Sequence, residues 1–418
     1  MSIASTNVPE ESLLRGYTGK ISLLLAFGWL MIMAGRSLLP VLLPLISIEL
    51  SLTPDKAGFA LTVVWLFYSV AQYPGGRFSD QLSRKTILVL SLSAMVLGLI
   101  LLTQIQTYFQ FLAAGALLGV GAGGYFCPTR ALLSDFYSKK RGQAFGIQVA
   151  SGRTGSAIAA LLGGVALGGA ILGYPFWRQA FFPVILLLIC VTILLHKWNT
   201  EPYKFGHWIF KRKFPYISHS HLRLDLGSTG SRVFSNKKIR LILLAYIFFA
   251  ITSQAFSSFL PTFLLMERGF STTLTSIGFA TLFIVGVPST LIGGFIGDRF
   301  SRMYFTMAAL FIGAIGLTIL LLFESPALVI FGIIVYALGM WSFPPVMQSY
   351  LFELFPEDTV GGDFGALKTI YTGVGSFGST YVGIVAVYSG SYGLAFVGLI
   401  VALFLGSSIL FFIGRSKL

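Results

Sequence analysis

The chain has 418 residues, of which 55% are hydrophobic and only 11% are charged, whereas about 25% of an ordinary soluble domain is charged. This composition excludes a soluble globular protein and indicates helices that lie in lipid. The formal net charge of +14 would suit a nucleic-acid partner. We expect none, because the positions of the basic residues follow a membrane topology.

Twelve mostly apolar windows follow one another along the chain, separated by short polar breaks or by breaks marked with Gly or Pro. Each is long enough for a membrane-spanning helix, which needs about 20 apolar residues. The predicted spans cover residues 21–46, 57–78, 86–106, 109–136, 142–172, 179–197, 239–265, 272–296, 303–323, 327–354, 362–389 and 391–413. The sequence therefore predicts an all-α polytopic membrane protein with twelve transmembrane helices.

The loops between these spans differ in charge. With the N-terminus inside, most lysines and arginines face the cytoplasm, and only Lys56, Arg178 and Arg268 face outward. This asymmetry follows the positive-inside rule, so both termini are predicted to be cytoplasmic in the cell membrane. The first 20 residues lack the apolar core of a cleaved signal peptide, so we expect the first span to direct insertion.

Rare charged residues and glycine pairs recur at a constant offset of 218 positions. Gly75, Gly76, Asp80 and Arg84 recur as Gly293, Gly294, Asp298 and Arg302, while Glu49 recurs as Glu267 and Asp135 as Glu353. Such a repeat indicates a duplicated structural unit, and an even number of spans per unit makes the two copies parallel repeats. We predict two six-helix bundles, residues 1–197 and 239–418, joined by a basic cytoplasmic linker at 198–238.

The chain offers little chemistry of the kind that enzymes use. His207, His219 and His221 in the linker lack partners such as Cys that would complete a metal site. No nucleotide-binding loop and no nucleophile–base arrangement stands out. We therefore predict neither an enzyme nor a cofactor.

Each repeat carries the same loop motif, G-G-R-F-S-D-Q-L-S-R-K at 75–85 and G-G-F-I-G-D-R-F-S-R at 293–302. The glycines permit close helix approach, and the carboxylate at a helix end can pair with nearby bases or cap a helix. We interpret each motif as a latch whose contacts exist in only one conformation. The alternative is a tight turn with positive-inside charges. The candidate latch residues are Gly76, Asp80, Arg84, Gly294, Asp298 and Arg302.

These two segments resemble the signature loop of the major facilitator superfamily, in which a Gly is followed four residues on by an Asp and then by bases. Departures are Gln81 in place of a base and Ser83 and Ser301 in place of Gly. The resemblance covers nearly the whole chain. It implies two six-helix bundles around a midplane site and a secondary transporter that works by alternating access.

Three further segments are similar to the anion:cation symporter branch of that superfamily: Arg36, Pro128-Thr129-Arg130, and Gly173 with Trp177-Arg178. Two other patterns of the superfamily are missing. No arginine opens the fourth span, and the fifth span lacks the Gly-Pro pattern typical of antiporters. Both absences argue against drug/proton antiport and leave the coupling ion open.

Arg36, Arg130 and Arg153 are basic residues inside predicted spans, roughly 24, 14 and 18 Å from the nearest cytoplasmic charge at 1.5 Å per residue. Each costs about 2.5–3.5 kcal/mol to insert, so we expect an aqueous cavity or a partner at each. Lys368, early in the eleventh span, adds a fourth candidate. Alternatives stay open: Arg130 could pair with an internal acid such as Asp135, and Arg153 could serve packing between helices.

Arg36 and Arg130 in the first repeat correspond to Gln254 and Gln348 in the second. Guanidinium groups can bind an anion, and amides can bind hydroxyl or carbonyl groups, so facing pairs would form an asymmetric site. Acids are nearly absent at this depth, and no proton relay is visible. The predicted substrate-binding residues are Arg36, Arg130, Arg153, Gln254, Gln348, Lys368, Tyr68 and Tyr371, with Tyr125 and Trp341 as further candidates for the lining.

The sequence thus predicts a secondary active transporter that moves a small organic anion of the carboxylate type across the cytoplasmic membrane. The alternatives are efflux of amphipathic drugs or sugars by antiport and, outside transport, a membrane receptor or sensor. The expected partners are the anion, a coupling proton or sodium ion and the lipid bilayer, with the protein acting as a monomer. Substrate identity and the direction of transport are left open.

Overall fold

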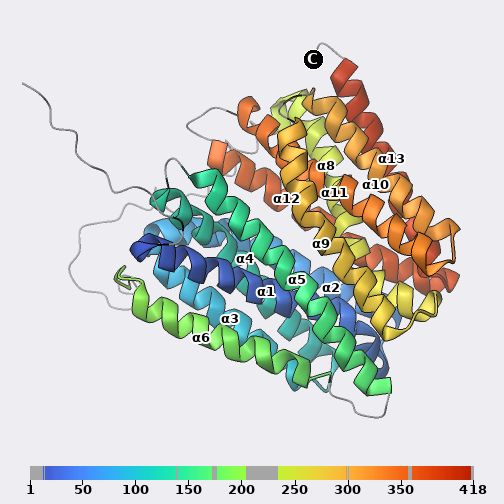
Figure 1. The fold of residues 1–418 in the computed structure, drawn as a ribbon, viewed down its shortest axis with the longest axis horizontal. Helices are drawn as coiled ribbons and strands as arrows, with labels where there is room; N and C mark the ends of the chain where they lie inside the picture. The colour runs from blue at the N-terminus through green and yellow to red at the C-terminus, as the bar shows by residue number, and fades with distance from the viewer. Residues whose placement is uncertain are drawn as a thin grey trace, which may run out of the picture.

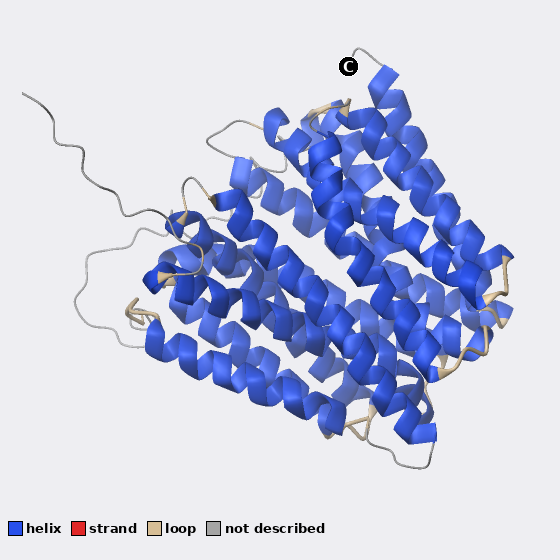
Figure 2. Cartoon of the chain, in the orientation of Figure 1, coloured by secondary structure: helices blue, strands red, loops and turns tan. Residues whose placement is uncertain are grey.

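The computed structural model describes residues 13, 15–137, 140–171, 177–203, 234–297, 299, 301–355 and 360–415, without the side chains of 80, 81, 170, 171 and 360–362. Within this part of the chain there are twelve long helices and no strand (Figure 2). Each helix coincides with one predicted span. The prediction of an all-α protein with twelve transmembrane helices is therefore confirmed.

The first six long helices form one bundle and the last six a second (Figure 1). The first bundle contains α1 (Gly16–Glu49), α2 (Pro54–Gln81), α3 (Arg84–Thr103), α4 (Tyr108–Phe136), α5 (Arg141–Ile171) and α6 (Phe182–Trp198). The second contains α8 (Lys237–Thr262), α9 (Thr272–Gly297), α10 (Arg302–Leu322), α11 (Pro326–Leu354), α12 (Val360–Ser389) and α13 (Tyr392–Arg415). A 3-10 turn (Gln179–Phe181) precedes α6, and a π-helical turn (Phe263–Glu267) extends α8.

Local sequence explains where several helices begin. Thr107 caps α4 through a capping box, because its hydroxyl accepts from the Gln110 backbone and the Gln110 side chain accepts from the Thr107 backbone. Pro54 and Pro326 occupy the first positions of α2 and α11, where a missing N–H costs nothing. Asn236 accepts from two backbone amides at the start of α8.

Ten of the twelve helices are long and apolar enough to cross a membrane by themselves, and the two exceptions among the described helices are α2 and α5. Both lie between the bundles, where α2 packs against α12 and α5 against α9. A helix covered by protein in this way needs less apolar surface than one that faces lipid on most sides. We refer to these two contacts as the α2–α12 seam and the α5–α9 seam.

The α2–α12 seam is held by side chain to backbone hydrogen bonds. Thr62 donates to the carbonyl of Ser376 at 2.8 Å, and Ser69 donates to the carbonyl of Thr369 at 2.7 Å. A Cβ on Gly58 would lie 2.5 Å from the carbonyl oxygen of Ser379, so the two backbones touch near the end where α1 leads into α2. We call this the far end, and the end where α1 begins and α13 finishes the terminal end.

The offset of 218 seen in the sequence also relates contacts in space. Arg84 forms an ion pair with Asp135 between α3 and α4, and Arg302 forms one at 2.5 Å with Glu353 between α10 and α11. The two pairs occupy equivalent places in their bundles at the terminal end. Each ties the start of one helix to the end of the next.

The far ends of the bundles use equivalent acids with different partners. Glu49, the last residue of α1, accepts hydrogen bonds from Trp177 at 2.8 Å and from both terminal nitrogens of Arg178. Glu267, at the end of the turn after α8, accepts from Ser391 at 2.8 Å and from backbone amides at the start of α13. In both bundles an acid thus joins the first helix to the last.

Candidate substrate-binding site

Arg36 lies midway along α1 and rests on the aromatic face of α2. Its guanidinium carbon is 4.0 Å from the ring centre of Trp65 and 5.0 Å from that of Tyr68, distances typical of cation–π contacts. Within the described chain it makes neither a hydrogen bond nor an ion pair, and its buried Nη1 lacks an acceptor. A buried guanidinium without an acceptor is a candidate anion-binding group.

Arg130, near the end of α4, has similar surroundings. Its guanidinium carbon lies 4.5 Å from the ring centre of Phe126 and 5.3 Å from that of Phe145 on α5. Its buried Nε has no acceptor. Asp135, which the sequence offered as an alternative partner, pairs with Arg84 instead.

Lys368 brings a third cation to the same place from the other bundle. Its Nζ lies 3.5 Å from the ring centre of Phe126, so this ring of α4 contacts both Arg130 of its own bundle and Lys368 of α12. The two cationic groups are at most 8.0 Å apart, because their distances to the shared ring centre are 4.5 and 3.5 Å. The sequence did not single out Phe126.

Tyr68 connects Arg36 to the other two cations. Its ring centre is 5.0 Å from the guanidinium carbon of Arg36, and Arg130 and Tyr371 of α12 are near enough to act on it electrostatically. Tyr371 also stacks on Tyr246 of α8, with ring centres 4.4 Å apart. Arg36, Arg130 and Lys368 therefore form one group between the bundles, which we call the basic cluster.

The basic cluster has no carboxylate partner among the described residues. The ion pairs of that part of the chain lie at Arg84, Arg178 and Arg302, and none of the cluster cations makes a hydrogen bond or ion pair there. Asp363 is buried in the first turn of α12, but five residues of helix place it on a different side from Lys368. The described side chains also include no group that could hold a metal ion.

Arg153 lies elsewhere, in the contact between α5 and the second bundle. Its guanidinium carbon is 4.5 Å from the ring centre of Trp341 on α11, and its Nη1 is 3.0 Å from where a Cβ on Gly286 of α9 would stand. Trp341 is fixed in turn, because its Nε1 donates to the carbonyl of Leu282 at 3.0 Å. Like Nη1 of Arg36, its buried Nη1 has no hydrogen-bond partner among the described residues. The contacts of Arg153 are with α9 and α11, and no described contact joins it to the basic cluster.

The two predicted glutamines have different environments. Gln254 is buried in the second bundle, where its Nε2 donates to the carbonyl of Thr372 at 3.1 Å and its Oε1 has no partner. Gln348 is half-buried on α11 and makes no hydrogen bond to a described residue. Of the further candidates for the lining, Tyr125 is fully buried and donates to the carbonyl of Leu25, which is a packing role.

Gln72 is a residue that sequence reasoning missed. It is 3% exposed, and neither its Oε1 nor its Nε2 has a hydrogen-bond partner. It follows Trp65 by seven residues and Tyr68 by four on α2, spacings that put all three on one helix face. An amide at this spacing from two aromatic residues in an apolar helix is the signal that would have found it.

The loop motifs at the terminal end are described in part. A Cβ on Gly75 would lie 3.0 Å from the Cα of Gly124, and one on Gly293 would lie 2.7 Å from the Cβ of Ser342, so these glycines mark close helix contacts. Gly76 is in ordinary contact with Cys127, and a Cβ on Gly294 would meet nothing within 4 Å.

The charged members of the predicted latch are only partly described. Arg84 and Arg302 form the two equivalent ion pairs given above. The side chain of Asp80 and the whole of Asp298 lie outside the described residues. The part of the latch that involves these two acids stays a prediction.

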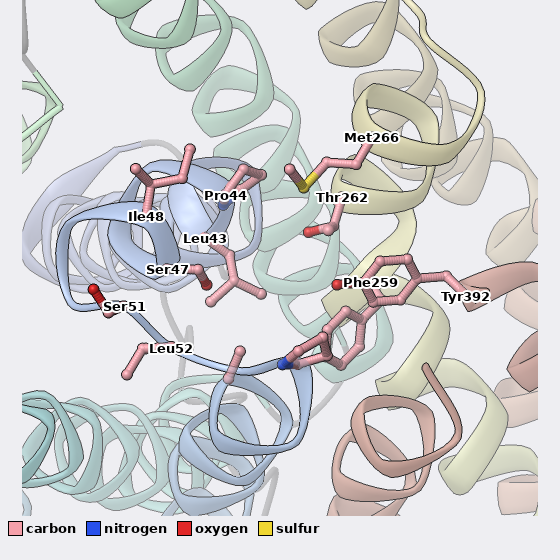
Figure 3. A pocket seen from close by; sticks show the side chains of 12 residues that line it. Leu43, Pro44, Ser47, Ile48, Ser51, Leu52, Phe259, Thr262, Met266 and Tyr392 are labelled. Atoms are coloured by element: carbon pink, nitrogen blue, oxygen red, sulfur yellow. The ribbon is translucent and has the colours of Figure 1, made fainter. Parts of the chain in front are cut away.

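A separate cavity of about 330 Å³ lies at the far end, between α1 and α2 of the first bundle and α8 and α13 of the second (Figure 3). Its lining is mostly apolar and contains no charged side chain. The hydroxyl of Thr262, 3% exposed, has no hydrogen-bond partner there. The lining residues are Leu43, Pro44, Ser47, Ile48, Ser51, Leu52, Pro54, Ala57, Phe259, Thr262, Met266 and Tyr392.

Comparison with known families settles what kind of protein carries this arrangement. The sequence profile of the Major Facilitator Superfamily matches residues 25–379, most of the chain. The chain belongs to the major facilitator superfamily. The predicted resemblance is confirmed, and so is the expectation that the protein is a multi-pass membrane transporter and not an enzyme.

Relatives of this major facilitator are named for different functions. The cis,cis-muconate transport protein of Acinetobacter baylyi is 24% identical over 402 residues, covering 93% of this chain and 92% of the relative. The multidrug resistance protein MdtG of Escherichia fergusonii is 27% identical over 386 residues, covering 88% of each chain. A probable nitrate transporter of Staphylococcus haemolyticus is 23% identical over 365 residues, with 86% of this chain and 88% of the relative covered.

Solved structures agree with the fold of this facilitator. A bacterial homologue of the human lysosomal transporter Spinster, in an inward-facing and unoccupied conformation, superposes with a TM-score of 0.80 at 18% identity. The match covers 96% of this chain and 98% of that one. At this identity the likeness concerns the fold alone.

Proposed function

We propose that the protein is a secondary active transporter that moves a small organic anion of the carboxylate type across the cytoplasmic membrane by alternating access. The observation that carries the proposal is the basic cluster, three half-buried cations with no carboxylate partner among the described residues. Two unit charges about 4 Å apart interact by roughly 4 kcal/mol at an effective dielectric of about 20. An anion therefore binds such a site strongly, and a cation is excluded.

The seams support alternating access. The basic cluster lies between the bundles, with Arg36 and Arg130 on one and Lys368 on the other. The α2–α12 seam is closed by backbone contact near the far end. Release of substrate on that side requires the seam to open there, so the closed seam is one of two states that the transporter visits.

The proposed orientation places both termini in the cytoplasm, which makes the far end the outer side of the membrane. Arg178 and Arg268 then lie outside, and Arg77, Arg84, Arg299 and Arg302 lie inside, as the positive-inside rule requires. The coupling ion is a proton or sodium, and the functional unit is a monomer.

Reconstituted protein tests this proposal directly. Proteoliposomes are given a panel of labelled organic acids, with proton or sodium gradients imposed separately. We expect accumulation of at least one acid and dependence on one of the two gradients. Binding of acids without any accumulation would make the protein a receptor, and the transport proposal would be wrong.

A second candidate function rests on the far-end cavity. Its apolar lining and volume of about 330 Å³ would suit an amphipathic molecule, and MdtG relatives are named for multidrug resistance. This alternative predicts that inverted vesicles accumulate neutral or cationic amphipathic dyes. The basic cluster argues against it, because three unpaired cations repel a cationic drug.

A further inference from the structure

The basic cluster has two separate poles, each built on its own aromatic platform. Arg36 rests on Trp65 and Tyr68, which both belong to α2. Arg130 and Lys368 share the ring of Phe126 on α4. Tyr68 belongs to the first platform, with its ring centre 5.0 Å from the guanidinium carbon of Arg36, and Arg130 of the second pole is near enough to act on it electrostatically.

The poles are also offset along the membrane normal. Trp29 of α1 packs against Phe126 of the second pole, with ring centres 5.4 Å apart, and Arg36 lies seven residues, roughly 10 Å, farther along the same helix. The offset of about 10 Å is too large for one carboxylate to bridge in bidentate fashion. Each pole can accept an acidic group of its own.

We propose that the substrate is a dianion, a dicarboxylate with one acid group at Arg36 and the other between Arg130 and Lys368. This inference rests on the proposed transport of an organic anion and narrows the class. A monoanion at either pole leaves the other pole without a counter-charge. In particular, a buried donor stays without an acceptor, either Nη1 of Arg36 or Nε of Arg130.

The aromatic rings at the two poles determine which kind of chain can join the two acid groups of the substrate. Trp65, Tyr68 and Phe126 present ring faces that three cations occupy in this conformation. A cation–π contact is weaker than a charge-assisted hydrogen bond to a carboxylate. Carboxylates therefore draw the cations off the rings, and the freed ring faces pack against an apolar or unsaturated chain.

The second pole has one cation on each bundle, so a bound carboxylate affects how close the two bundles lie. Arg130 belongs to the first bundle and Lys368 to the second, so a carboxylate bound between them holds both. A group that contacts both bundles favours the conformation in which they are close around it. The pole at Arg36 belongs to the first bundle alone, so the acid group bound there does not join the two bundles.

Binding to the purified full-length protein in lipid nanodiscs tests the inference. The probes are the linear dicarboxylates from succinate to suberate and, for each one, its monomethyl ester, which keeps the length and removes one charge. For the best length we expect the dicarboxylate to bind about 10- to 100-fold more tightly than its ester, the range that one charged hydrogen-bonded contact provides.

Three variants locate the effect. Arg36→Gln and Lys368→Gln should each lower the preference for the dicarboxylate over its ester to about one. Arg153→Gln removes a half-buried arginine of the α5–α9 seam that has no described contact with the basic cluster, and should leave the preference unchanged. Thermal unfolding of each variant checks that it is folded.

The outcomes separate this inference from the proposed function. Equal affinity of wild-type protein for every dicarboxylate and its ester would overturn the dianion while leaving an anion transporter intact. Binding of neither acids nor esters, with binding of a cationic analogue, would overturn both. Loss of the preference in Arg153→Gln as well as in the cluster variants would mean that it does not arise at the two poles.

Discussion

The two seams between the bundles are related by the offset of 218 but differ in chemistry. Tyr68 in the α2–α12 seam corresponds to Gly286 in the α5–α9 seam, and Tyr371 corresponds to Arg153. In the first seam the two tyrosines interact beside Arg130. In the second, the arginine itself crosses the seam and rests on Trp341, close to the space that a side chain on Gly286 would fill.

A repeated backbone therefore does not imply a repeated site. The α5–α9 seam holds a single arginine against a tryptophan, while the α2–α12 seam lies beside three cations. Differences at a few equivalent positions produce this result. When the two halves are aligned, Arg36 corresponds to Gln254, Arg130 to Gln348, and Lys368 to Ala150. The positive charge of the site is therefore a local divergence on a symmetric fold.

The largest expected effect comes from removing the positive charge of Arg36. Arg36→Gln should weaken binding of a carboxylate substrate about 100-fold, the upper range for a charged hydrogen bond. Arg36→Lys should weaken it less, because the charge remains while the planar fork is lost. Arg153→Gln is the matched control and should leave affinity nearly unchanged. Equilibrium binding to the three variants measures this. Wild-type affinity in Arg36→Gln would mean that the charge of Arg36 serves folding and does not bind the substrate.

The next largest effect concerns closure of the α2–α12 seam. Gly58→Ala puts a methyl group 2.5 Å from the carbonyl oxygen of Ser379 and 3.3 Å from the Cα of Gly383, which are backbone atoms. Overpacking of this kind costs about 1–3 kcal/mol, so we expect the transport rate to fall about tenfold. Gly142→Ala meets nothing within 4 Å and serves as control. Equal rates in both variants would show that far-end closure is not part of the cycle.

A smaller effect is expected at the loop motifs. Asp80→Asn and Asp298→Asn should each lower turnover several-fold while substrate affinity stays within about twofold, because a latch biases conformations without touching substrate. Counterflow rates and equilibrium binding give the two quantities separately. Unchanged rates in both single variants would leave the loops as tight turns.

The smallest effect tests Gln72. Its amide is buried with neither polar atom satisfied, so a substrate group or water is expected to bind there. Gln72→Leu keeps the approximate volume and removes the amide, and affinity for a substrate that uses it should fall about three- to tenfold. Gln148 is similarly buried and unsatisfied on α5, and Gln148→Leu is the comparison. An equal fall of affinity in both variants would mean that Gln72 does not bind the substrate.

The fold was predictable because its signals are local. Apolar windows of spanning length placed every long helix, and residues related by the offset of 218 form the equivalent ion pairs at Arg84 and Arg302. The depth of Arg36 and Arg130 likewise follows from counting residues along a helix. Each of these inferences needs only one helix or one repeat.

The parts of the site that escaped prediction depend on how the bundles face each other. Arg153 has the same depth signal as Arg130, yet the rotation of α5 turns it toward Trp341. Phe126 matters because Lys368 reaches it from the other bundle. Helical periodicity orients a side chain relative to its own helix only, so the partner across the seam cannot be read from it.

Charge selectivity of the wild-type protein in proteoliposomes tests the central claim most directly. Uptake of a labelled carboxylate substrate is measured in competition with unlabelled substrate, a neutral amide of the same shape and a cationic amine of the same shape. A site with three cations and no described carboxylate partner should be blocked by the anion at concentrations at least about 100-fold lower than by the amide, and the amine should not compete. Competition by the amine as strong as that by the anion would contradict an anion-binding site at Arg36, Arg130 and Lys368.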